Sequence, residues 1–108
     1  MNQDKLDFMR LPRLPGRLTT EEAAWYLGFS THDIPVLVSN KLLKPLGSPP
    51  QNATRYFAGS DLEKVRTDSK WLDRASSTLI QHWRKKNDRK RYSDELDTLT
   101  KPVNASRP

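Results

Sequence analysis

Residues 18–34 read Leu18-Thr-Thr-Glu-Glu-Ala-Ala-Trp-Tyr-Leu-Gly-Phe-Ser-Thr-His-Asp-Ile34, a pattern typical of two short helices joined by a tight turn. Thr19 and Glu22 stand three residues apart, so each side chain can accept the free backbone N–H of the other and open the first helix. Gly28 can adopt the positive φ that ends that helix. Ser30 is placed to cap the start of the second helix. The stretch therefore predicts a helix-turn-helix.

An apolar stripe accompanies each of the two predicted helices, which cover residues 21–27 and about 31–39. The stripe residues recur three and four positions apart, as on one face of a helix; they are Ala23, Ala24 and Leu27 in the first helix and Ile34, Leu37 and Val38 in the second. Asp33 lies in the first turn of the second helix, where a negative charge is favoured. Pro35 removes one backbone hydrogen bond, a small cost so near a helix start.

A β-hairpin is predicted after the second helix. Two short, partly apolar runs, at 42–46 and 53–57, flank a loop rich in Gly, Pro and Asn. Pro45 lacks a backbone N–H, which confines its strand to a sheet edge. A two-stranded hairpin is marginally stable alone and needs to lie against the helices. We therefore interpret this hairpin as a wing.

Two further helices are predicted beyond the hairpin. Ser60 and Glu63 have the spacing of a second capping box, which opens a helix over residues 60–66. A last helix is predicted over residues 70–86, where large and small apolar residues recur every four positions; they are Trp71, Ala75, Leu79 and Trp83. The expected fold class is mostly α with a small β-hairpin wing, a winged helix-turn-helix with an added C-terminal helix.

Composition limits the chain to one small domain. Its 108 residues are 34% hydrophobic, with a mean hydropathy of -0.85, so we expect a compact domain over residues 17–86. Residues 1–16 are expected to be a flexible segment because of their Pro and Gly, and residues 87–108 a basic and then polar disordered tail. There is no secretory apolar region, no membrane-length apolar run and no cysteine. A cytoplasmic protein without membrane contact is the expectation.

Positive charge is concentrated near the C-terminus. The net charge is +6, and residues 84–91 alone hold six Lys or Arg and one Asp. Such a run is typical either of a site for a polyanion or of the solvated end of a helix. Charge alone leaves both interpretations open.

The order of elements and several motifs resemble the MerR/excisionase-like winged helix-turn-helix family over about residues 17–66. The similarity lies in Thr-Thr-Glu-Glu-Ala-Ala-x-x-Leu-Gly-x-Ser at 19–30, followed by Leu42-Leu43, Arg55-Tyr56 and Ser60-Asp61-Leu62. The chain also resembles a group of small bacterial proteins that share the stretches at 32–38 and 42–47. The family resemblance implies DNA binding, with the second helix in the major groove and the wing near the backbone. It implies a transcriptional regulator or an excisionase-like accessory factor.

The expected DNA contacts fall into two groups. A reading helix needs hydrogen-bond donors for base edges and phosphates, yet the candidate reading face carries Thr31, His32, Asp33, Pro35, Val36 and Ser39, with no cation before Lys41. Base contacts are therefore assigned to Thr31, His32 and Ser39. Phosphate contacts are assigned to Lys41, Lys44, Arg55, Arg84, Lys85, Lys86, Arg89, Lys90 and Arg91.

A protein-interaction adaptor on the same scaffold is the alternative function, either with another protein or as a homodimer. Its contact surface would be the apolar, proline-bearing second helix, with Val36, or an exposed patch at Trp25. The other interpretation of Trp25 is that it packs against the stripe formed by Trp71, Leu79 and Trp83, because aromatic side chains dominate core burial.

Nothing in the sequence indicates catalysis. His32 and His82 are the only histidines, and neither has a carboxylate pair at metal-ligand spacing or a nucleophile placed beside it. There is no phosphate-binding Gly loop. We therefore expect no catalytic residues, no metal, no cofactor and no small-molecule substrate.

Overall fold

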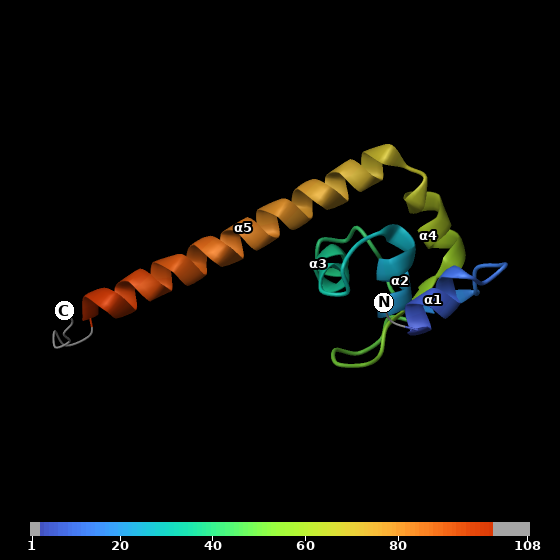
Figure 1. The fold of residues 1–108 in the computed structure, drawn as a ribbon, viewed down its shortest axis with the longest axis horizontal. Helices are drawn as coiled ribbons and strands as arrows, with labels where there is room; N and C mark the ends of the chain where they lie inside the picture. The colour runs from blue at the N-terminus through green and yellow to red at the C-terminus, as the bar shows by residue number, and fades with distance from the viewer. Residues whose placement is uncertain (1–2, 101–108) are drawn as a thin grey trace.

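The computed structural model describes the backbone of residues 3–100 and the side chains of residues 3–91. This part of the chain is mostly helical, with five helices and one two-stranded antiparallel sheet (Figure 1). The elements are α1 (Gln3–Met9), β1 (Arg17–Thr19), α2 (Thr20–Leu27), α3 (Asp33–Ser39), β2 (Tyr56–Ala58), α4 (Gly59–Arg66) and α5 (Ser69–Thr100). Four short helices form a body, from which the far half of α5 projects.

The first predicted helix and its turn are confirmed. Thr19 caps α2 by accepting the Glu22 N–H at 3.2 Å, and the Glu22 carboxylate accepts the Thr19 N–H at 3.0 Å. Gly28 ends the helix with a φ of 88°, a left-handed conformation that favours glycine. Local capping chemistry therefore fixes α2.

The start of the second helix differs from the prediction. Helix α3 begins at Asp33, and Ser30 does not cap it. Instead, the Asp33 carboxylate accepts the Ser30 N–H at 3.1 Å. The carboxylate thus accepts a backbone N–H in front of the helix, whereas the predicted cap would have the Ser30 hydroxyl accept a backbone N–H inside it.

The predicted β-hairpin is wrong in its first strand. β2 pairs with β1, with Leu18 opposite Phe57, and residues 42–46 form no strand. The chain turns sharply after α3 because Lys41 has a φ of 63° and the Leu42 N–H donates to the Leu37 carbonyl at 2.9 Å. One hydrogen bond of the expected pairing remains, from the Leu46 N–H to the Tyr56 carbonyl at 2.8 Å. The loop before β2 still projects from the body (Figure 1).

The core lies between the small sheet and helices α2 to α5. Its fully buried large side chains come from the two strands, α3 and α4; they are Phe57, Leu18, Ile34, Leu37 and Leu62. α5 adds Trp71, Ala75 and Leu79, which are buried as the four-residue spacing predicts. The apolar stripe of the last helix is therefore part of the core.

Both predicted flexible segments contain helix in the described residues. Residues 3–9 form α1, which packs through the buried Phe8, whereas the sequence predicted an irregular lead-in. Helix α5 continues past Lys86 to Thr100, although its polar residues gave no apolar period. The prediction of a disordered tail is wrong for residues 87–100, and its remainder, 101–108, lies outside the described residues.

The predicted capping box at Ser60 is also absent. α4 begins at Gly59, directly after β2, and its N-cap residue Ala58 makes no side-chain cap. The Gly59 N–H donates to the Gly16 carbonyl at 2.9 Å, which brings the two backbones together. The close backbone approach, and not a hydroxyl, sets the start of α4.

Gly59→Ala is expected to lower the free energy of unfolding by about 1–3 kcal/mol, because overpacking a tight site costs that much. An added Cβ would meet the Pro15 carbonyl oxygen, a backbone atom that cannot move aside cheaply. Gly16→Ala is the matched control, since a Cβ there meets no atom within 4 Å. Urea denaturation measures both; equal stability of the two variants would contradict the close approach.

Candidate nucleic-acid interface

Helix α5 packs along α3 in the opposite direction. The indole N–H of Trp71 donates to the Leu42 carbonyl, just past the end of α3, at 3.0 Å. The indole N–H of Trp83 donates to Oδ1 of Asp33, the first residue of α3, also at 3.0 Å. Because the earlier tryptophan holds the later end of α3, the two helices run antiparallel, and α5 beyond Trp83 projects past the start of α3.

Contact with α5 changes which residues α3 can offer to a ligand. Oδ1 of Asp33 accepts the Trp83 bond and Oδ2 accepts the Ser30 N–H, so both carboxylate oxygens already have donors. Val36, expected on the reading face, is only 7% exposed. The predictions that Val36 lies on a reading face or forms an adaptor surface are therefore wrong.

The exposed side of α3 and its preceding turn consists of Thr31, His32, Pro35 and Ser39. The Ser39 hydroxyl donates to the Val36 carbonyl at 3.2 Å, which leaves its oxygen as an acceptor. Neither the exposed His32 imidazole nor the exposed Thr31 hydroxyl forms a hydrogen bond that caps α3. This side can offer a few polar contacts and carries no Lys or Arg side chain.

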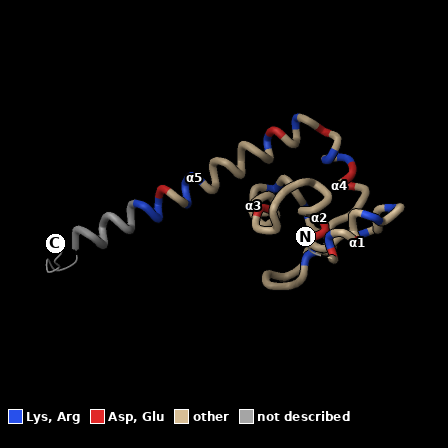
Figure 2. Tube along the Cα trace, viewed as in Figure 1, with Lys and Arg blue, Asp and Glu red and all other residues tan. Residues whose placement is uncertain are grey.

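The six cations of residues 84–91 lie on α5 immediately after Trp83, and we call them the basic stretch; they are Arg84, Lys85, Lys86, Arg89, Lys90 and Arg91 (Figure 2). All six are exposed. Two have local contacts: the Lys86 ammonium lies 5.1 Å from the Trp83 ring centroid, and Arg91 pairs with Asp88 at 2.7 Å. The stretch thus forms a positively charged rod that starts beside the N-terminal end of α3.

The remaining predicted phosphate contacts lie elsewhere. Lys41 is exposed and follows α3, at the end away from the basic stretch. Lys44 is exposed and lines a groove of about 250 Å³ between residues 42–44, β2 and α4, next to Asp61 and Lys64. Arg55 is half-buried just before β2. The basic stretch therefore begins near the end of α3 that carries Thr31 and His32, through the Trp83–Asp33 bond, whereas Ser39 and Lys41 lie at the other end of α3 and Lys44 and Arg55 lie near β2.

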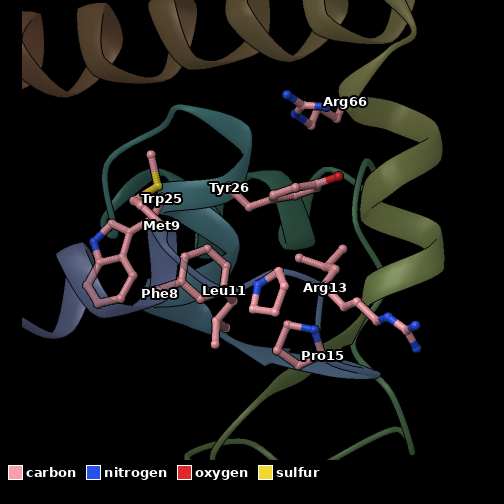
Figure 3. Close-up of a pocket in the computed structure, with 10 residues that line it drawn as sticks. Phe8, Met9, Leu11, Arg13, Pro15, Trp25, Tyr26 and Arg66 are labelled. Atoms are coloured by element: carbon pink, nitrogen blue, oxygen red, sulfur yellow. The ribbon is translucent and has the colours of Figure 1, made fainter.

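Sequence reasoning missed a second surface, a groove of about 340 Å³ between the N-terminal segment and α2 (Figure 3). The Phe8 and Trp25 ring centroids are 5.8 Å apart in its wall, and the Arg66 guanidinium lies 5.1 Å from the centroid of Tyr26. Met9, Arg13 and the prolines and leucines of residues 11–15 complete the lining. The groove could not be predicted because α1 gave no periodic signal.

The prediction that Trp25 packs on the α5 stripe is wrong. Trp25 faces α1, and Phe29 takes the predicted place, with its ring centroid 6.3 Å from that of Trp71. A cation over an aromatic ring at the sheet was also missed: the Arg17 guanidinium lies 3.9 Å from the Tyr56 ring centroid. Arg17 lies on β1 and Tyr56 on β2, and the sequence did not indicate that these two strands pair.

Two kinds of feature are absent from the described part of the chain. No three or more acidic or histidine side chains in this part gather closely enough to hold a metal ion. None of its helices combines the length and apolar character that crossing a membrane requires.

The chain matches no protein-family model, no curated protein and no solved structure. Its function is therefore inferred from the geometry and charge of its own residues.

Proposed function

We propose that this protein binds double-stranded DNA and performs no chemistry on it, as a small transcriptional regulator or an excisionase-like accessory factor. The observation that carries the proposal is the basic stretch: six exposed cations on a formed helix, directly beyond the turn at Thr31 and His32. Within residues 3–91 the ion pairing of these cations is limited to Arg91 with Asp88. Phosphates are the chemistry that such a cluster suits best.

The arrangement also supports a winged helix-turn-helix interpretation. α2, the Gly28 turn and α3 follow one another as the motif requires, and a projecting loop precedes β2. In this proposal Thr31 and His32 of the turn and α3 lie near the DNA groove, while Lys44 and Arg55 each contact one phosphate. The lack of cations on α3 means that most of the affinity comes from α5.

An adaptor remains the second candidate, and the groove beside α2 favours it. Met9 and Leu11 on its rim are 61% and 48% exposed, and aromatic residues with a nearby Arg are typical of protein-binding hot spots. The adaptor surface in this version is the groove of Trp25 and Tyr26, because the apolar residues Ile34, Val36 and Leu37 of α3 are buried. The two candidates use separate surfaces and can be tested separately.

A charge-matched pair of variants tests the DNA proposal. Arg84→Gln with Lys85→Gln should reduce the slope of log affinity against log salt by about two, at about 0.9 for each phosphate contact. Lys70→Gln with Arg74→Gln is the control, because these exposed cations lie at the other end of α5. Fluorescence anisotropy with random 20-bp duplexes measures both slopes. Equal slopes for the two variants would show that only net charge matters; no binding by the intact protein at low salt would favour the adaptor.

A further inference from the structure

We infer that the basic stretch of α5 lies inside the major groove of the duplex, with a phosphate backbone on each side, and that α5 is the principal DNA-inserted helix in place of α3. This inference rests on the proposed function and specifies its binding mode. It follows from the arrangement of the six cations around the helix axis, from the accessibility of the stretch and from its dimensions.

The cations fall on three sides of α5. Residues four or seven apart share one side of a helix, at about 100° per residue, so the pairs are Arg84 with Arg91, Lys85 with Arg89, and Lys86 with Lys90. The three sides are roughly 100–130° apart on the same geometry. A helix lying on the outside of a duplex would use one side only. Positive charge on three sides of the helix matches a site in which phosphates lie on both flanks of that helix.

The stretch is accessible from all around. Among the side chains of α5 that the structure describes, which end at Arg91, Trp83 is the last partly buried one, and residues 84–91 are all exposed. The C-terminal part of α5 projects away from the other helices, as Figure 1 shows. No described element covers the stretch, so a duplex could surround it without moving the body.

Its dimensions and charge also fit. Eight helical residues span about 12 Å, and a helix with side chains is about 10–12 Å wide. The major groove of B-DNA is about 12 Å wide. A duplex carries one phosphate per about 1.7 Å of axis, or roughly seven over 12 Å, against six cations here. Since α5 continues as helix to Thr100, the stretch is not a fraying end and needs little ordering to bind.

The sequence bounds the site on its far side. Asp94, Glu95 and Asp97 follow the last cation of the stretch. Like charges repel, so these residues disfavour continued contact with phosphates. The proposed insertion therefore covers about two helical turns and three to four base pairs, by the rise of about 1.5 Å per residue and 3.4 Å per base pair.

Three double variants of equal charge test the insertion: R84Q/R91Q, K85Q/R89Q and K86Q/K90Q. Each is assayed by anisotropy on random duplex DNA across a salt series. We expect at least two of the three to lower the slope by about one to two units, because each lost phosphate contact removes about 0.9. A single effective pair, or none, would place the helix on the outside of the duplex and overturn the inference, while DNA binding itself would stand.

A second arm compares DNA with RNA duplexes of the same sequence. The major groove of A-form RNA is too deep and narrow for a helix to read, so we expect weaker binding and a shallower slope on RNA. Equal or tighter binding to RNA would contradict groove insertion. Absence of binding by the intact protein to either duplex at 50 mM salt would instead refute the proposed function, so the two failures are distinguishable.

Discussion

A chain ending at Arg66 is expected to be unfolded at 25 °C, whereas a chain ending at Lys86 keeps a cooperative transition close to that of the intact protein. The first cut removes Trp71, Ala75 and Leu79, which are 5%, 0% and 7% exposed. Burying one large apolar side chain contributes about 1.5–3 kcal/mol, and a domain of this size is stable by only about 3–10 kcal/mol. Losing this apolar stripe therefore removes most of the free energy of unfolding.

The second cut isolates the role of the distal helix. Among the described residues it removes none of the core, because residues 87–91 are exposed and the last core contact made by a described side chain of α5 is at Trp83. Circular dichroism during thermal denaturation measures both chains. Similar transitions for both would mean that α5 does not complete the core. A large loss in the longer chain would mean that the distal helix stabilises the body.

Replacing all six cations of the basic stretch by Gln should lower affinity for random duplex DNA by at least about 100-fold at 100 mM salt. Six lost phosphate contacts would remove about five units from the log–log slope. Gln is nearly as good a helix former as Lys or Arg, so α5 should remain helical by circular dichroism. Anisotropy measures the affinity directly.

The matched control exchanges Lys and Arg at the same six positions, which preserves charge. Its slope should equal that of the intact protein, since counterion release depends on the number of neutralised phosphates. If the Gln variant binds as tightly as the exchanged variant, the basic stretch is a solvated helix surface and the affinity comes from another part of the chain.

Elements fixed by neighbouring residues could be predicted from the sequence. The Thr19 and Glu22 side chains cap α2 locally, and Gly28 ends it. The apolar period of α5 correctly predicted its buried side, because a four-residue spacing places Trp71, Ala75 and Leu79 on one face. The charge of the basic stretch was likewise visible in the composition.

Features that depend on distant partners could not be predicted. β1 is three residues long and pairs with a strand about forty positions later, which is too short to show a period. The bond between Trp83 and Asp33 joins residues fifty positions apart and makes Asp33, expected on the reading face, part of the α3–α5 packing. Trp25 packs against Phe8 of α1, a seven-residue helix that the sequence pattern did not indicate.

The most direct test of DNA binding through α5 is a titration of the ¹⁵N-labelled intact protein with a random 12-bp duplex at low salt, followed by heteronuclear NMR. We expect the amide shift changes to concentrate at residues 84–91. Smaller changes are expected at Thr31 and His32, and none around Phe8 and Trp25 in the groove beside α2. Unchanged spectra at low salt, or changes confined to that groove, would contradict DNA binding through α5.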